Sequence, residues 1–249
     1  MTSSVPLDSN YTQITALIDS SGSMAQLNTT ELAQGLNQMI KDNISDGVEV
    51  RFDGAKFSNK ISIFADGVDA RTINITPDDI SPNGMTSLVP AFARMIRHTG
   101  SSLDKMTDRR PGKVIFILLS DGEQTSDHLL NREDSDTPYE GKNGYENLKK
   151  LVEEHKNTYN WQFFFLGTNF DSISVGESFG LNKDSCMNYH HSDGGTANAL
   201  RSCSSAINRV VDGSFEGFTD KDRIDSQNPN VLPSNNKRLK RMNVDSDLN

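Results

Sequence analysis

Five oxygen-bearing side chains stand in three short polar segments of this chain. Asp19, Ser21 and Ser23 alternate in the segment DSSGS, Thr86 lies in GMTS, and Asp121 lies in LSDG. These three hydroxyls and two carboxylates are hard oxygen donors, and no His or Cys stands among them. Such a donor set suits Mg²⁺, Mn²⁺ or Ca²⁺ and does not suit Zn²⁺. The residue types therefore predict a site for one divalent cation, provided that the fold brings the three segments together.

The three segments fall at the ends of predicted secondary-structure elements. Residues 11–18 predict a strand that runs directly into the first segment, and the apolar run 113–120 (KVIFILLS) is typical of a strand buried on both faces. A helix is predicted to begin near Ser87, and residues 48–57 and 60–64 alternate as a β-hairpin does. Alternating strands and helices indicate an α/β sheet covered on both faces. Such sheets bind ligands at the carboxyl ends of strands where the strand order reverses.

The chemistry of this donor set predicts how an ion would behave in it. Three neutral hydroxyls leave a cation under-neutralised, and the two carboxylates can act on it through water and through the serines. Such an ion retains affinity for one more anionic oxygen, which the carboxylate of a partner protein can supply. The helix that begins after Thr86 adds the positive end of its dipole nearby, which also favours an incoming anion.

The five residues, in this order and on these elements, resemble the von Willebrand factor type A (vWA) domain. The likeness covers about residues 11–211. It implies a Rossmann-like, doubly wound, mostly parallel sheet with one antiparallel edge strand and helices on both faces. It also implies a metal-ion-dependent adhesion site, in which the three hydroxyls bind the ion directly and the two carboxylates bind it directly or through water. Residues 120–123 (SDGE) and 161–167 (WQFFFLG) are similar to a stand-alone intracellular branch of this family in microbes and their viruses.

Composition and charge divide the chain and limit its partners. Residues 1–10 form a polar extension, residues 11–212 the vWA-like domain, and residues 213–249 a tail whose polar composition predicts disorder. The net charge of −9 disfavours binding of nucleic acid or an anionic membrane by the body of the chain. No apolar run approaches the ~20 residues that span a bilayer. The basic block Lys237–Arg241 in the tail can be a nuclear-import signal, a nucleic-acid contact or a solvated end.

These features predict a monomer in a reducing compartment. Two cysteines in 249 residues cannot form a disulfide framework, so we expect a cytoplasmic protein, or a nuclear one if the host cell has a nucleus. The predicted partner is a protein that offers an Asp or Glu carboxylate to a bound Mg²⁺ or Mn²⁺. We expect no enzymatic activity.

Two other functions compete with this prediction. A Mg²⁺-dependent phosphatase of the haloacid dehalogenase type also begins with a strand that ends in Asp, but its acid/base Asp two residues later is replaced here by Ser21. A hydroxyl cannot perform that proton transfer at neutral pH. A metal-independent scaffold is the other alternative, and it predicts partner binding that EDTA does not affect.

Other reactive residues are better explained by ordinary structure. His190, His191 and Asp193 resemble a metal cluster, but adjacent residues at a strand end point to opposite faces, so a surface loop is the better interpretation. Cys186 and Cys203 are predicted to be small buried apolar residues.

An acidic, turn-rich segment spans residues 124–143 and is predicted to be an exposed insertion. Its acidic cluster, Glu133, Asp134 and Asp136, lacks the spacing of a calcium-binding loop. We therefore expect these three carboxylates to lie in solvent and to take no part in the metal site.

Overall fold

Six strands form one sheet in the order β3-β2-β1-β4-β5-β6. The structure is a computed structural model that describes residues 5–45, 47–121, 124–168, 171–190, 193–214 and 217–227. The strands are β1 (Leu7–Asp19), β2 (Glu49–Phe57), β3 (Ile61–Asp69), β4 (Arg110–Ser120), β5 (Gln162–Gly167) and β6 (Cys186–Asn188). The pair β2 and β3 is antiparallel and all other neighbouring strands are parallel, so the predicted antiparallel edge strand is β3.

The central strands are apolar on both faces, which is why they sit in the middle of the sheet. In β4, Ile115, Ile117 and Leu119 face one hydrophobic core, while Phe116 and Leu118 face the other. All five side chains are at most 1% exposed. Burying such a side chain contributes about 1.5–3 kcal/mol, so the alternation fixes the strand between two layers of helices. This confirms the sequence prediction of a strand buried on both sides.

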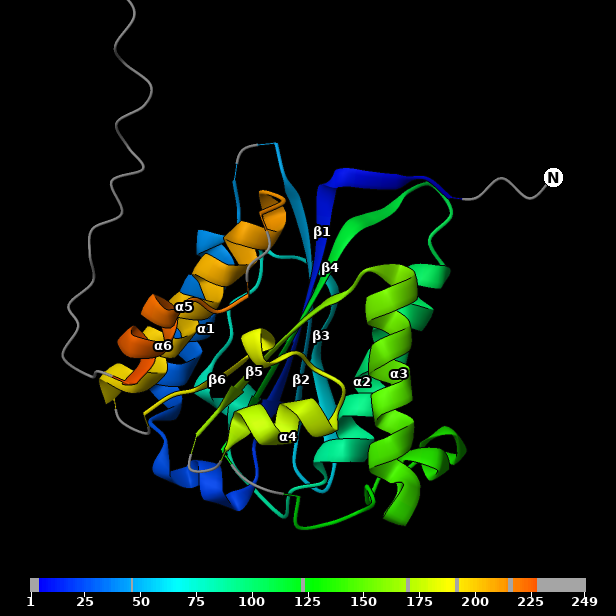
Figure 1. Cartoon of the computed structure of the whole chain (residues 1–249), viewed down its shortest axis with the longest axis vertical. Coiled ribbons are helices and arrows are strands. Elements are labelled where there is room, and N and C mark those ends of the chain that lie inside the picture. Colours follow the sequence, from blue (N-terminus) through cyan, green and yellow to red (C-terminus); the bar gives the residue numbers. More distant parts are fainter. Residues whose placement is uncertain are drawn as a thin grey trace, which may run out of the picture.

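Helices cover both faces of the sheet (Figure 1). One core is formed with α1 and α5, and α6 packs on α5; the other core is formed with α2, α3 and α4. The helices are α1 (Thr29–Asp42), α2 (Leu88–Asp104), α3 (Gly144–Tyr159), α4 (Ser172–Ser178), α5 (Asp193–Val211) and α6 (Asp220–Gln227). Within the described part of the chain, none of these helices has both the length and the apolar character that crossing a membrane requires.

The strand order reverses between β1 and β4. From β1 the chain moves outward to β2 and β3, and from β4 it moves outward in the other direction to β5 and β6. Ile18 lies opposite Leu119 in the parallel ladder, so Asp19 and Ser120 are the next residues of their strands at the same edge. The two predicted acidic segments therefore meet at the topological switch point, where α/β sheets bind ligands.

The first strand begins earlier than the sequence predicts. β1 starts at Leu7 instead of Tyr11, because β4 also extends back to Arg110 and the two strands pair there. The residues of this extension are largely polar and exposed, so hydrophobic alternation does not reveal it.

Within the tail that the sequence predicts to be disordered, the described residues 217–227 include the helix α6 (Asp220–Gln227). Thr219 and Asp222 cap its first turn: the backbone N–H of Thr219 donates to the Asp222 carboxylate at 2.8 Å, and the backbone N–H of Asp222 donates to the Thr219 hydroxyl at 3.2 Å. Asp222 also pairs with Arg209 of α5 at 2.6 Å. Local capping and this ion pair stabilise a helix with little apolar surface. The basic block 237–241 lies outside the described residues.

Candidate metal centre

Asp19 is fully buried at the end of β1 and is held by two hydrogen bonds. Its Oδ1 accepts the backbone N–H of Ser21 at 2.8 Å, and its Oδ2 accepts the hydroxyl of Ser120 at 2.6 Å. Burial raises the pKa of Asp19 to about 6; the two hydrogen bonds oppose this shift, and the negative charge of Asp121 adds to it. A carboxylate at this position is therefore costly unless a cation is bound nearby.

A chain of hydroxyls leads from this carboxylate to the second one. The Ser21 hydroxyl lies 3.0 Å from the Ser23 hydroxyl, which donates to Oδ1 of Asp121 at 2.8 Å. Ser21 and Asp121 are buried, whereas Ser23 is exposed. Four of the five predicted residues thus lie in one hydrogen-bonded network that opens to solvent at Ser23. Ser120, which completes the network, was not predicted as a site residue, although it directly precedes Asp121.

Thr86 lies on a neighbouring loop that is docked against the first segment. The backbone N–H of Gly22 donates to the carbonyl of Gly84 at 2.9 Å, and the N–H of Asn83 donates to the carbonyl of Ser20 at 2.6 Å. Gly84 has a φ of 85°, and a Cβ there would lie 2.7 Å from an oxygen of Asn59, so only glycine fits this turn. These contacts bring the buried Thr86 to the same sheet edge as the other four residues.

The segment that follows Asp121 fastens the Thr86 loop from the other side. We call residues 124–140 the strap. The backbone N–H of Thr86 donates to the hydroxyl of Thr125 at 2.9 Å, and the carbonyl of Thr86 accepts the backbone N–H groups of Thr125 and Ser126 at 2.9 and 3.0 Å. The Gln124 side-chain oxygen accepts the N–H of Val89 at 2.8 Å. One backbone N–H at the start of α2 is thus already bonded. This helix end therefore has fewer free N–H groups for an incoming anion than the sequence predicts.

The strap also overturns the prediction of a solvated acidic cluster. Asp136 is fully buried, and its carboxylate pairs with Arg94 and Arg97 of α2, the latter at 2.6 Å. Burial alone raises the pKa of Asp136, but the hydrogen bond from Arg94 and the other contacts outweigh it and leave the pKa lowered. Asp136 is therefore buried because it pairs with two arginines of α2. The polar pattern around Asp136 in the sequence does not show that these arginines are its partners. Glu133 and Asp134 are exposed, as predicted.

A buried tyrosine hydroxyl lies at the same sheet edge. Tyr189, directly after β6, is 3% exposed, and its buried hydroxyl has no hydrogen-bond partner among the residues that the structure describes. Leaving a buried hydroxyl unsatisfied costs about 1–3 kcal/mol. Burial raises the pKa of the Tyr189 phenol, and the charges of Asp121 and Asp19 raise it further, so the hydroxyl is within electrostatic reach of both carboxylates. The sequence does not indicate Tyr189 as a site residue, because an aromatic ring at this position is expected to pack in the hydrophobic core.

These groups fit a hard divalent cation. The donors are hydroxyls and carboxylates, the two carboxylates lie in one network, and a buried hydroxyl nearby lacks a partner. The described residues contain no group of three or more His, Cys, Asp and Glu side chains that could hold a metal ion. A soft-metal site is therefore not found in the described part of the chain.

The other predicted reactive residues are two cysteines and the polar cluster at residues 190–193. Cys186 and Cys203 are buried free cysteines, and burial raises the pKa of Cys186 to about 12, as expected for inert core thiols. His190 is exposed, whereas His191 lies outside the described residues, as does the side chain of Asp193.

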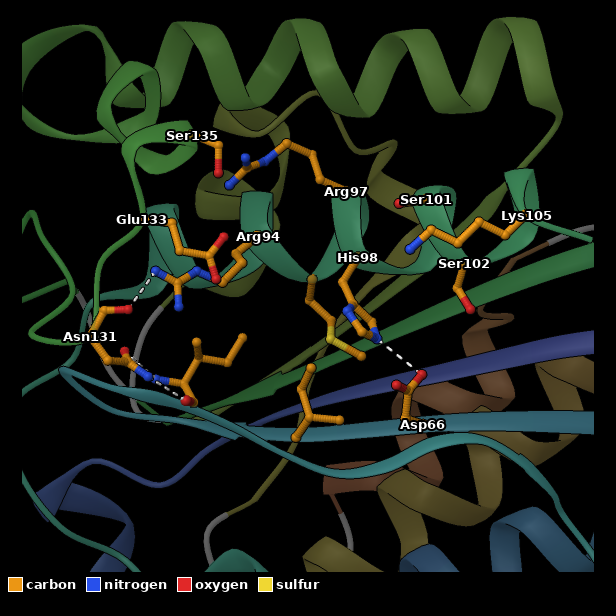
Figure 2. Close-up of a pocket in the computed structure, with 13 residues that line it drawn as sticks. Asp66, Arg94, Arg97, His98, Ser101, Ser102, Lys105, Asn131, Glu133 and Ser135 are labelled. Atoms are coloured by element: carbon orange, nitrogen blue, oxygen red, sulfur yellow. Dashed lines mark hydrogen bonds and ion pairs between the residues drawn. The ribbon is translucent and has the colours of Figure 1, made fainter.

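A cavity of about 590 Å³ lies away from the metal centre, between α2, β3 and the strap (Figure 2). Several of its polar groups are paired: His98 lies 3.2 Å from Asp66, and Arg94 donates to the carbonyl of Asn131 at 2.9 Å while it pairs with Asp136. Asn131 also bonds the backbone of Ile61 at the edge of β3. This pairing is typical of a structural contact between the strap and the body of the fold.

Comparison with known proteins identifies the fold. No family model matches the chain, and no curated protein matches it. The vWF domain of the type V pili tip protein Mfa5 from Porphyromonas gingivalis is similar in structure, with a TM-score of 0.54 and 11% identity over 87% of this chain and 99% of that domain. Proximal thread matrix protein 1 from the mussel byssus is similar with a TM-score of 0.54 and 10% identity, over 78% of this chain and 45% of that one.

The fold is therefore that of a vWA domain, as the sequence predicts. A further structure of the mussel protein has a zinc-occupied MIDAS motif, the metal-ion-dependent adhesion site; it matches with a TM-score of 0.52 and 16% identity, over 79% of this chain and 46% of that one. This chain thus spans less than half the length of the mussel protein. The adhesion motif of that mussel protein therefore holds a divalent metal.

Proposed function

We propose that this chain is a divalent-metal-dependent protein-binding module. Asp19, Ser21, Ser23, Thr86 and Asp121 would hold one ion, and the ion would capture a carboxylate of a partner protein. The observation that best supports the proposal is the continuous network from Asp19 through the two serines to Asp121, at the switch point of a vWA fold. Its members lie on segments that are about 100 residues apart in the chain.

The hydroxyls and the carboxylates would have different roles in such a site. The hydroxyls are neutral, so they would hold the ion without cancelling its charge, and the ion would supply the attraction for an anionic oxygen. The buried Asp19 accepts the N–H of Ser21 and the hydroxyl of Ser120. Asp121 accepts the hydroxyl of Ser23, so both carboxylates orient polar groups of the site and supply negative charge. The exposed Ser23 leaves an open side for a partner group.

The oxygen donors favour Mg²⁺ or Mn²⁺ as the resident ion. The zinc in the similar mussel structure belongs to that protein, but it makes Zn²⁺ a necessary member of any titration series on this chain. That the chain is a monomer, that it is cytoplasmic and that its partner is an acidic protein group stay predictions.

Partner capture tests the proposal. The full chain, immobilised, is incubated with extract of its native host in Mg²⁺ or in EDTA, beside the variants Thr86→Ala and Thr107→Ala. Thr107 is an exposed threonine beyond the end of α2 and serves as the matched control. We expect capture in Mg²⁺ by the wild type and by Thr107→Ala, and loss of capture in EDTA or with Thr86→Ala, whose unfolding temperature stays unchanged. Capture that persists in EDTA would indicate a metal-independent scaffold, and an unfolded Thr86→Ala would make Thr86 structural.

The strap provides a second prediction. Thr125→Val keeps the shape of the side chain but removes the oxygen that accepts the N–H of Thr86. Losing one partner of a buried N–H costs about 1–3 kcal/mol, and we expect the affinity for Mg²⁺ to fall about tenfold because Thr86 loses one of its three hydrogen bonds to the strap. Calorimetric titration measures the affinity. Thr125→Ser should restore it, and Thr137→Val, elsewhere in the strap, should leave it unchanged. Unchanged affinity in Thr125→Val would show that the strap does not position Thr86.

A further inference from the structure

Tyr189 is linked by backbone hydrogen bonds to the strand ends that form the metal centre. Its N–H donates to the carbonyl of Gly167 at 2.9 Å, at the end of β5. Next along the edge, the N–H of Thr168 donates to the carbonyl of Ser120 at 3.3 Å, directly before Asp121. Tyr189 therefore lies at the carboxyl ends of the strands, as the predicted ligands do, and it follows β6, which is two strands away from β4.

The packing of the Tyr189 ring does not explain its hydroxyl group. The ring belongs to the core that contains Ile18, Leu119 and Leu166, the residues just below the metal centre on β1, β4 and β5. A phenylalanine would make the same apolar contacts without burying an oxygen. Within the described part of the chain, the hydroxyl has no hydrogen-bond partner, and it is within electrostatic reach of Asp121 and Asp19. Buried hydroxyls almost always have a partner, so this one indicates a bound group that completes the site.

We propose that Tyr189 is a further member of the metal centre and that its hydroxyl bonds a water molecule held by the divalent ion. The inference rests on the proposed function, because it needs an ion at the five predicted residues. Water bound to a divalent cation is a strong hydrogen-bond donor, and the phenol oxygen would accept from it. Tyr189 would thereby hold the ion's hydration on the side of β5 and β6, where none of the five predicted residues lies.

Tyr189→Phe tests the assignment with measurements that separate binding from folding. We expect the ion-free variant to unfold at the same temperature as the wild type or higher, because an unsatisfied buried hydroxyl is removed. We expect its affinity for Mg²⁺, measured by calorimetry, to fall about tenfold, the lower end of the effect of groups that orient metal ligands. Tyr159→Phe, at the exposed end of α3, is the control and should bind Mg²⁺ like the wild type.

Terbium luminescence supplies an independent reading. Tb³⁺ binds hard oxygen ligands and emits when a nearby aromatic side chain transfers energy to it. Trp161 stands at the opposite edge of the sheet, at the start of β5, so we expect most of the tyrosine-excited Tb³⁺ emission to come through Tyr189 and to drop in Tyr189→Phe, but not in Tyr159→Phe.

The outcomes separate the two proposals. Unchanged Mg²⁺ affinity and unchanged emission in Tyr189→Phe would overturn the role of Tyr189 and leave the metal site standing. A strongly destabilised ion-free variant would make the hydroxyl structural and also overturn it. If the wild type itself takes up no divalent ion, the proposed function fails first, and the role of Tyr189 fails with it.

Discussion

Asp19→Asn is expected to weaken binding of Mg²⁺ and Mn²⁺ about 100-fold while the ion-free protein stays folded. The amide can still accept the N–H of Ser21 and can donate to the hydroxyl of Ser120, so the local geometry is kept and only the negative charge is lost. Because burial raises the pKa of Asp19 to about 6, the charged form destabilises the ion-free fold. The asparagine variant should therefore unfold at the wild-type temperature or higher at neutral pH. Calorimetry and thermal unfolding measure the two effects.

Asp53→Asn is the matched control for this result. Asp53 is also a fully buried carboxylate in the sheet, and burial also raises its pKa, but it lies in β2 and bonds the N–H of Gly67 at 2.7 Å, away from the metal centre. Its replacement should leave ion binding unchanged. Equal uptake of Mg²⁺ by the wild type and Asp19→Asn would remove Asp19 from the site.

Asp136→Ala is expected to destabilise the fold by about 3 kcal/mol, because removing one member of a buried ionic cluster leaves uncompensated charge behind. Arg94 and Arg97 would both lose their partner, and their side chains are only 11% and 25% exposed. Unfolding by urea at neutral pH measures the loss. Asp134→Ala, on the exposed side of the same turn, should change stability by less than about 0.5 kcal/mol.

The same carboxylate predicts a pH dependence. The pKa of Asp136 is lowered in the folded state, so its stabilising contribution is present above the pKa of the unfolded chain, about 4. The contribution is lost as the pH falls from there through the folded-state pKa. The difference in stability between the wild type and Asp136→Ala should therefore shrink in acid. A difference below 1 kcal/mol at neutral pH would mean that the cluster is solvated, as its sequence suggests.

The fold could be predicted where each strand carries its own signal. The run 113–120 is apolar at successive positions, which a strand buried between two layers requires, and the structure places it in the centre of the sheet. Asp19 and Asp121 were identified because each directly follows such a strand, and parallel neighbours end at one edge. Position along the chain therefore predicts that these carboxylates meet if the two strands are neighbours, and the structure shows that they are.

The strap could not be predicted, because its order depends on contacts far away in the sequence. Asp136 is polar and stands among turn residues, and only the arginines of α2 make it a buried residue. The helix α6 did carry a local signal that was overlooked, the Thr219-x-x-Asp222 capping pattern. Tyr189 could not be identified from the sequence for another reason. Its apolar ring is expected to be buried, and nothing in the sequence shows that its hydroxyl lacks a partner among the described residues.

A crystal of the full chain soaked in Mn²⁺ tests the central claim most directly. The account predicts one anomalous peak at the carboxyl edge between β1 and β4, with the hydroxyl oxygens of Ser21, Ser23 and Thr86 at about 2.0–2.6 Å, the range of hard-cation ligands. A peak elsewhere in the molecule, or no peak at this edge in a well-ordered soaked crystal, would contradict it.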